Sequence, residues 1–317
     1  MIDLLLLLAG FVALIFGADK LVDGASSLAS RLGVPNIVIG LTIVAFGTSA
    51  PELVVNIFAA YSNSTEMVLG NVLGSNIFNV LGILGISALI YPLAVKNNTT
   101  WLEVPLSLLA AVAVLVFASD TLLDSAASNI ISRADGITLL LFFCIFLVYN
   151  ITLAVGSKNE EETPTEHYSY TKAILFIVLG LAGLVIGGRL IVTSAVSIAQ
   201  LLGLSERVIG LTVVSIGTSL PELATSVVAV RKRNVDIAIG NVVGSNLFNI
   251  FFILGLSTVV TPLAVNPGSL TDMLVNVVSG LLLFIFIFTG RGRQLARWEG
   301  GVFLALYVAY LVLLISQ

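Results

Sequence analysis

Charged residues are scarce in this sequence, and their scarcity excludes an ordinary soluble domain. Asp, Glu, Lys and Arg make up 10% of the 317 residues, and hydrophobic residues 58%, whereas soluble domains carry about a quarter charged residues. Apolar runs such as 4–17, 174–188 and 274–288 are separated by short polar clusters. Such a chain cannot cover itself with polar surface in water, so we expect a multi-pass protein of the cell membrane surrounded by lipid.

Cysteine and histidine occur once each, which removes several kinds of site. Cys144 lies in the apolar run 139–148, where we expect it to pack as a small hydrophobe, and it has no second cysteine to pair with. His167 stands in a polar stretch, so no histidine-based zinc site can form. The polar motifs contain no set of nucleophile, base and orienting residue. We therefore expect no enzyme and no resident cofactor.

The apolar segments are long enough for ten membrane-spanning helices. About 20 apolar residues cross the hydrocarbon core. The first run lacks the basic start and cleavage site of a signal peptide, so it is counted as a spanning helix. The predicted helices occupy residues 2–30, 36–61, 67–90, 101–118, 135–156, 171–201, 206–230, 236–260, 270–289 and 298–315.

An internal duplication appears when the chain is aligned with itself so that position 38 lies over position 208. Residues 38–95 then match 208–265 without a gap, and 29 of the 58 positions are identical. Each unit, 1–156 and 171–317, then holds five helices. An odd number of helices makes the second unit enter the membrane from the opposite side. The sequence thus predicts an all-α integral membrane protein of ten transmembrane helices, built as two inverted five-helix repeats.

The basic residues predict the orientation in the membrane. With the N-terminus outside, ten Lys and Arg residues fall in inside loops and two in outside loops. Because Lys and Arg favour cytoplasmic loops, both termini are predicted to be extracellular and the polar linker 157–170 cytoplasmic.

Two polar strings recur in both units. GTSxPE occupies 47–52 and 217–222, and GNxxGSNxFN occupies 70–79 and 240–249. All four segments fall within predicted spanning helices, where polar groups are costly and functional. Serine, asparagine and glycine also hold helices together by packing and hydrogen bonds, which is the alternative role for each of them taken singly.

The glutamates of the first string require a different explanation. Glu52 and Glu222 follow Pro51 and Pro221, and a carboxylate at this depth costs roughly 2.5–3.5 kcal/mol on insertion scales. No Lys or Arg lies in these strings, so the natural partner is a bound cation or a proton. Proline also opens the helix and frees backbone carbonyls. Carboxylates, carbonyls, hydroxyls and amides are the hard oxygen ligands of Ca²⁺ and Na⁺.

The paired strings resemble the α-repeats of the sodium/calcium exchanger family in the calcium/cation antiporter superfamily, over essentially the whole chain. The short linker, without an appended regulatory domain, resembles the prokaryotic type. The resemblance implies that Glu52 and Glu222 hold Ca²⁺ with the carbonyls of Thr48 and Thr218, and that helices one and six slide against the other eight. It also implies that the Na⁺ sites are completed by Ala45, Ser49, Ser75, Asn79, Ser215, Ser219, Ser245 and Asn249.

One position departs from the pattern of the family. Many of these exchangers carry Asp where this sequence has Asn249, so the site holds two carboxylates instead of three. Two negative charges match one Ca²⁺ or two Na⁺, which leaves the stoichiometry open. Because K⁺ transport in relatives is associated with an acidic residue in this region, we expect a K⁺-independent exchanger.

Four further charges lie well inside predicted helices. They are Asp19, Lys20, Asp23 and Arg189, and Asp19 and Arg189 occupy equivalent positions in the two units with opposite charges. A shared ion-binding role is therefore not expected. We expect these side chains to reach the membrane interface or to pair with one another.

The sequence as a whole predicts a secondary active antiporter that exchanges Na⁺ for Ca²⁺ by alternating access. The first alternative is an H⁺/Ca²⁺ antiporter of the same fold, with a glutamate as proton carrier. The second is a cation channel lined by the same oxygen ligands; inverted repeats with broken helices favour the transporter. Besides Ca²⁺, Na⁺ and lipid, no partner is expected, neither nucleic acid nor a required protein.

Overall fold

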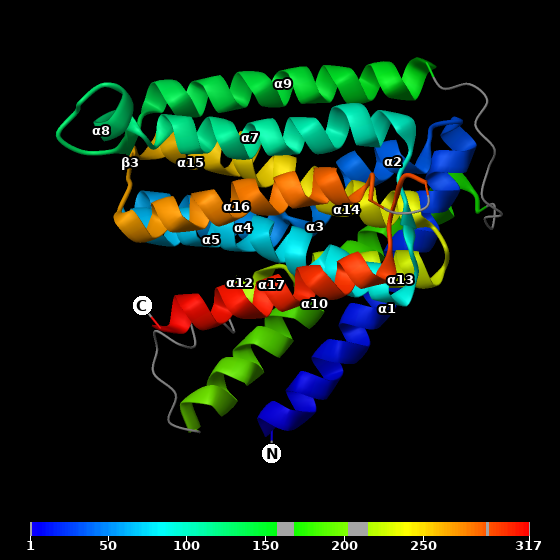
Figure 1. Cartoon of the computed structure of the whole chain (residues 1–317). Coiled ribbons are helices and arrows are strands. Elements are labelled where there is room, and N and C mark those ends of the chain that lie inside the picture. The colour runs from blue at the N-terminus through cyan, green and yellow to red at the C-terminus, as the bar shows by residue number, and fades with distance from the viewer. Residues whose placement is uncertain (1, 157–167, 202–214, 290–291, 317) are drawn as a thin grey trace.

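A computed structural model describes residues 2–156, 168–201, 215–289 and 292–316 (Figure 1). In this part of the chain, eight helices are long and apolar enough to cross a membrane, or nine when a bent pair is counted as one span. The predicted helix over 206–230 lies partly outside the described residues. The structure is therefore a helical membrane fold, with boundaries a few residues from those predicted.

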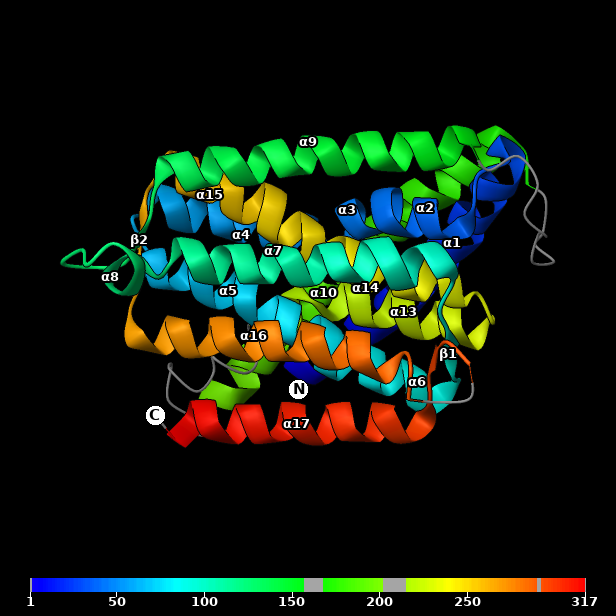
Figure 2. The same cartoon turned by 45° about the horizontal axis from the view of Figure 1, so that its top comes forward.

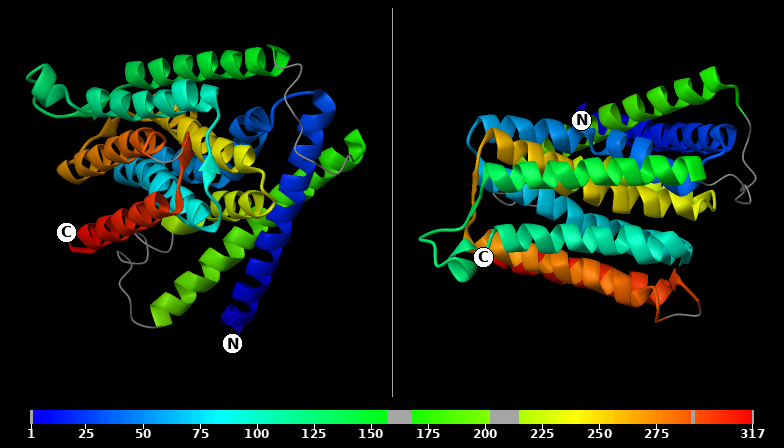
Figure 3. Two further views of the ribbon diagram at one scale, coloured as in Figure 1. Left: turned by 45° about the vertical axis from the view of Figure 1, so that its right-hand side comes forward. Right: turned by 90° about the horizontal axis from the view of Figure 1, so that it is seen from above.

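The helices α1 (Ile2–Leu32) and α10 (Tyr170–Leu201) lie side by side and cross the other helices obliquely (Figures 1 and 3). Glycines bring their backbones together: a Cβ on Gly17 would lie 2.7 Å from the Gly180 carbonyl oxygen, and one on Gly180 2.6 Å from the Leu21 nitrogen. Small residues allow such contact between membrane helices. We call these two helices the α1/α10 pair.

The second predicted helix is broken where the first GTSxPE string lies. It consists of α2 (Asn36–Ile39), the π-helical η1 (Gly40–Val44), α3 (Ala45–Thr48) and α4 (Ala50–Tyr61), and its two halves meet at 49°. A proline in the first turn of α4 explains the break, because proline has no N–H and fits only the start of a helix. The expected opening of the helix is confirmed.

The second unit repeats this break. Helix α12 (Ser215–Thr218) is followed by Ser219 and by α13 (Leu220–Arg231), again with a proline in the first turn. The bounds of α12 and α13 coincide with those of α3 and α4 when the two units are aligned by sequence.

The GNxxGSNxFN strings lie in two spans that match in the same alignment. The first span is α5 (Thr65–Ile77), η2 (Phe78–Leu84) and α6 (Gly85–Ile90), and the second is α14 (Val235–Leu247), η5 (Phe248–Leu254) and α15 (Gly255–Val260). The predicted helices over 67–90 and 236–260 are confirmed. The π-helical turns η2 and η5 were not predicted; such turns are common at functional sites.

The remaining helices line the outside of this core (Figure 2). They are η3 (Thr99–Glu103), α7 (Val104–Phe117), the short α8 (Asp120–Leu123), α9 (Arg133–Gly156), α16 (Pro267–Phe286) and α17 (Arg297–Ser316). Cys144 is exposed on α9, so its expected packing inside the protein is wrong. Because α9 is apolar on all sides, its sequence gives no signal for the face that meets the bundle.

Two short antiparallel pairings join the units at their loops. Strand β1 (Leu93–Ala94) pairs with β4 (Gln294–Leu295), and β2 (Ile130–Ile131) pairs with β3 (Leu263–Ala264). Each pairing therefore joins a strand of one unit to a strand of the other. Strands of two residues are too short to show an alternating pattern, so the sequence did not predict them.

Candidate ion-binding site

The two glutamates lie in the first turns of α4 and α13 and are bonded across the units. The Ser49 hydroxyl donates to Glu222 Oε1 over 2.9 Å, and the Ser219 hydroxyl donates to Glu52 Oε1 over 3.1 Å. Each glutamate is only 1% exposed. The two GTSxPE strings, far apart in the chain, therefore form one site.

The helix breaks provide backbone oxygens at this site. Pro51 and Pro221 have no N–H, so the carbonyls of Gly47 and Gly217 lose the helical donor four residues ahead. The carbonyl of Ala45 is not free in the same way, because it accepts a hydrogen bond from the Ser49 amide over 3.0 Å. The Thr48 hydroxyl lies 3.3 Å from the same oxygen, so the second lone pair of Ala45 is open to a cation only when that hydroxyl bonds to Asn241 Oδ1, 3.0 Å away.

The serines and asparagines of the second string reach the same place. Ser245 lies 3.3 Å from Glu222 Oε1, and Ser75 lies 3.0 Å from the Ser219 hydroxyl. All of these side chains are buried. Ser75 of the first unit and Ser245 of the second therefore both reach the start of α13, where Ser219 and Glu222 lie.

Asn79 and Asn249 are oriented by a second set of crossed bonds. Asn79 Nδ2 donates to Asn246 Oδ1, and Asn249 Nδ2 donates to Asn76 Oδ1, each over 2.9 Å. With the amide nitrogens held in this way, the oxygens of Asn79 and Asn249 remain as acceptors. Their positions at the start of η2 and η5 place them in the π-helical turns.

Four buried oxygens of the site have no hydrogen-bond partner among the described residues. They are Glu52 Oε2, Glu222 Oε2, Asn79 Oδ1 and Asn249 Oδ1. Buried polar atoms are normally satisfied, and leaving a carboxylate oxygen unpaired is costly. The four come in equivalent pairs, and each is a hard ligand of the kind that Ca²⁺ and Na⁺ use.

A ring of asparagines around the site was not predicted to belong to it. Asn56 donates to the Glu52 carbonyl over 2.8 Å and to Asn71 over 2.7 Å, and Asn241 donates to the Glu222 carbonyl over 3.1 Å. These bonds hold the backbone of both glutamates. The repetition of Asn71 and Asn241 in the two strings was the signal that could have identified them.

Thr48 and Thr218 connect the site to this ring. Thr48 Oγ1 lies 3.0 Å from Asn241 Oδ1, and Asn71 Nδ2 donates to Thr218 Oγ1 over 3.3 Å. Both contacts run from one unit to the other. Of the other sequence-predicted residues, Ala45 is buried at the start of α3, whereas the side chain of Ser215 lies outside the described residues.

Comparison with known proteins identifies the family. The profile described as sodium/calcium exchanger protein matches residues 2–152 and 172–316, which is most of the chain. The chain belongs to the sodium/calcium exchanger family. It is 38% identical over 319 residues to the putative antiporter CaxA of Alkalimonas amylolytica, covering 98% of each chain. It is 36% identical over 345 residues to the sodium/calcium exchanger MaX1 of Methanosarcina acetivorans, covering 99% of this chain and 98% of MaX1.

Solved structures of the sodium-calcium exchanger NCX_Mj have the same fold. The structure soaked with Na⁺ and Ca²⁺ superposes with a TM-score of 0.84 at 33% identity, and 98% of each chain is covered. The family and the fold make this exchanger a membrane antiporter of Ca²⁺ and other cations, in a family of transporters and not of enzymes. A channel is not supported.

A cavity of about 520 Å³ lies beside the candidate ion site, between α4, α10, α12 and α13. Its lining includes Pro51, Thr218 and Pro221, which belong to or adjoin the site, and it includes Arg189 of α10. Arg189 is thus placed away from Asp19, so the two are not paired with each other. The cavity therefore reaches the helix break of each unit, at Pro51 and at Pro221.

Proposed function

We propose that this exchanger moves Ca²⁺ across the membrane in exchange for Na⁺ by alternating access. The observation that carries this proposal is the pair of buried glutamates, each bonded through one oxygen to a serine of the other unit and, within the part of the chain that the structure describes, unpaired at the second oxygen. No Lys or Arg lies in the strings that form the site, so the charge that neutralises Glu52 and Glu222 comes from bound ions.

The proposed Ca²⁺ ligands are the carboxylates of Glu52 and Glu222 and the backbone carbonyls of Thr48 and Thr218. The two carboxylates carry a charge of −2, which one Ca²⁺ or two Na⁺ would neutralise. A doubly negative empty site is costly to carry through the membrane, and this cost favours exchange over leak. The proposed Na⁺ ligands come from Ala45, Ser49, Ser75, Asn79, Ser215, Ser219, Ser245 and Asn249.

The proposed architecture is ten transmembrane helices in two inverted five-helix repeats, 1–156 and 171–317, joined by a cytoplasmic linker at 157–170. The recurrence of α3 to α6 as α12 to α15, with every bound shifted by the same number of positions, supports the repeat. The distribution of basic residues supports extracellular termini. In this arrangement each unit contributes an equivalent set of groups to one ion, and the two units run through the membrane in opposite directions.

The experiment that tests the coupling is ⁴⁵Ca²⁺ uptake into proteoliposomes. Vesicles loaded with Na⁺ are diluted into Na⁺-free buffer, and a matched set carries only a pH gradient. We expect uptake in the first set and none in the second. Uptake driven by the pH gradient alone would overturn Na⁺ coupling and make a glutamate the proton carrier.

The second candidate is the H⁺/Ca²⁺ antiporter of the same fold, because a buried carboxylate can bind a proton in place of Na⁺. The oxygens around the glutamates favour Na⁺. A proton needs one acceptor, whereas the hydroxyls and amide oxygens of Ser49, Ser219, Asn79 and Asn249 supply a coordination shell.

A further inference from the structure

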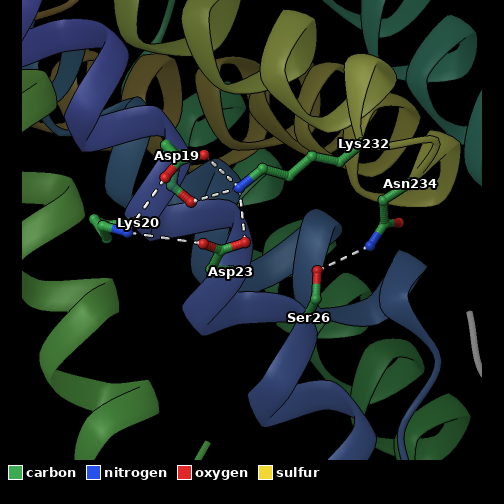
Figure 4. A network of polar contacts seen from close by, with 6 residues as sticks. All are labelled: Asp19, Lys20, Asp23, Ser26, Lys232 and Asn234. Carbon is green, nitrogen blue, oxygen red and sulfur yellow. Dashed lines mark hydrogen bonds and ion pairs between the residues drawn. The ribbon is translucent and has the colours of Figure 1, made fainter. Parts of the chain in front are cut away.

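Four charges form a compact cluster where α1 crosses the end of α13 (Figure 4). Lys232 directly follows α13, and its ammonium lies 2.5 Å from an Asp19 carboxylate oxygen and 2.7 Å from one of Asp23. Lys232 also donates to the Asp19 backbone carbonyl over 3.2 Å. These contacts join the α1/α10 pair to the rest of the protein. The sequence had predicted that Asp19, Lys20, Asp23 and Arg189 reach the membrane interface or pair with one another, without Lys232.

A second contact strengthens the same junction. The Asn234 side chain donates to the Ser26 hydroxyl over 2.9 Å, and both residues are buried (Figure 4). Because the contacts of Lys232 and Asn234 lie at successive turns of α1, they fix its position along its own axis. A shift of α1 by one turn would break all of them.

Asp19 and Asp23 keep a basic partner, Lys20, when Lys232 separates from them. Lys20 lies 3.3 Å from Asp19 and 4.0 Å from Asp23, and its ammonium also lies 5.0 Å from the centre of the Phe176 ring on α10. Lys20 therefore belongs to the α1/α10 pair. The side chains of the cluster are 25–40% exposed, so water can take over the released Lys232. A contact of this kind can open and close at little cost.

The first unit offers no equivalent of Lys232 to α10. When the two units are aligned by sequence, Lys232 corresponds to Ser62, which follows α4, and Asp19 corresponds to Arg189 of α10. Arg189 instead lines the cavity of about 520 Å³ between α4, α10, α12 and α13. The α1/α10 pair is thus fastened to α13 by α1, while the cavity along α10 separates α10 from the helix breaks at Pro51 and Pro221.

We propose that Lys232, with Asp19 and Asp23, is an ionic latch that holds the α1/α10 pair in the position that keeps the cavity open. The glycine contacts between α1 and α10 make them move together, so closing the cavity with α10 displaces α1 from α13 and separates Lys232 from its acidic partners. The latch sets the balance between the two access states. This inference rests on the alternating-access function proposed above.

Distance measurements between spin labels test the latch directly. Labels are attached at Leu32→Cys, at the end of α1, and Trp298→Cys, at the start of α17, in the full chain with Cys144→Ala; Leu32 and Trp298 are both exposed. Two distances are expected, one for each access state. Lys232→Ala removes contacts to two carboxylates, so it is expected to increase the population of the distance that belongs to the unlatched state about fivefold, the upper end of the range for an exposed ion pair. An unchanged distance distribution in Lys232→Ala would overturn the latch.

Matched variants separate the latch from a general effect of charge. Arg231→Ala removes the same charge one residue earlier, where no ion pair to a described residue is present, and is expected to leave the distribution unchanged. Asp19→Asn with Asp23→Asn is expected to reproduce Lys232→Ala, and adding Lys232→Ala to this double change should have no further effect. An equal shift in Arg231→Ala, or full additivity of the two changes, would contradict the proposal.

An equivalent latch can be introduced between α4 and α10. Ser62→Glu places an acid at the position equivalent to Lys232, and by the equivalence of the two units we expect this acid to meet Arg189 when the cavity closes. We expect Ser62→Glu to increase the population of the distance that belongs to the unlatched state about threefold. This effect should be lost when Ser62→Glu is combined with Arg189→Gln. These distances are read without any transport assay. Absence of Na⁺-driven uptake by the original chain would therefore count against the proposed function alone, and an unchanged distribution in Lys232→Ala against the latch alone.

Discussion

The hydroxyl of Ser49 lies 2.9 Å from Glu222 Oε1, although the two residues are 173 positions apart in the chain. The equivalent bond from Ser219 to Glu52 has a length of 3.1 Å. Each unit therefore stabilises the carboxylate of the other. An ion that binds one glutamate is in contact with both halves of the protein, which couples its binding to their relative position.

Neutralising either glutamate is expected to abolish Ca²⁺ transport. Glu52→Gln and Glu222→Gln each remove half the charge of the site, and loss of one partner from a buried charge pair costs about 3–5 kcal/mol. We expect Na⁺-driven ⁴⁵Ca²⁺ uptake to fall by about a hundredfold or more. Asp124→Asn is the control, since Asp124 is exposed beyond α8. Normal uptake by either glutamine variant would show that the site is wrong.

Acid is expected to inhibit transport, because protons and Ca²⁺ compete for the same two carboxylates. Uptake should fall as the pH is lowered toward the titration range of glutamate. A higher Ca²⁺ concentration should restore it, which distinguishes competition from unfolding. The measurement is the initial rate of uptake against pH at two Ca²⁺ concentrations, and a profile that is the same at both would contradict the idea.

A third carboxylate at the site is expected to change the ion balance. Asn249→Asp adds a negative charge beside the two glutamates and removes the amide that donates to Asn76 over 2.9 Å. We expect apparent Ca²⁺ affinity to rise about tenfold, the equivalent of about 1.4 kcal/mol, and the Na⁺ dependence to steepen. Asn79→Asp makes the equivalent change in the first unit and should act in the same direction. Unchanged Na⁺ dependence in both variants would place these residues outside the Na⁺ sites.

Removal of a crossed hydrogen bond is expected to weaken ion binding and leave the fold intact. Ser49→Ala and Ser219→Ala each delete a bond to a charged group, worth about 1.5–3 kcal/mol, together with a hydroxyl ligand. Half-maximal Na⁺ concentrations should rise about tenfold in uptake assays. Ser119→Ala is the comparison, because Ser119 bonds only to the Leu115 carbonyl among the contacts described for its side chain. Equal effects at all three serines would indicate general destabilisation.

Close packing of the α1/α10 pair is expected to depend on its glycines. Gly180→Ala would place a Cβ 2.6 Å from the Leu21 nitrogen, and such overpacking costs about 1–3 kcal/mol. We expect a lower unfolding temperature in detergent. Gly301→Ala on α17, where nothing lies within 4 Å of the added carbon, should raise stability by about 0.5–1 kcal/mol. A stability of Gly180→Ala equal to that of the original chain would mean that the helices separate easily.

The sequence by itself predicted the helices, the duplication and the two glutamates. These features depend on local composition: apolar runs of sufficient length, a proline before each Glu, and strings that repeat at a fixed offset. The resemblance of the paired strings to the exchanger family implied that Ser75, Asn79 and their counterparts belong with the glutamates. The structure brings these described side chains together, while their roles as ion ligands remain predictions.

The tertiary structure alone decided which groups meet across the units. The bonds from Ser49 to Glu222 and from Lys232 to Asp19 depend on how two broken helices and a tilted helix pack, which no local pattern encodes. The exposure of Cys144 was decided in the same way. Asp19 and Arg189 show the physical reason most clearly. They occupy equivalent positions, yet one lies in an ion cluster and the other beside a cavity, because the α1/α10 pair packs differently against the rest of the two units.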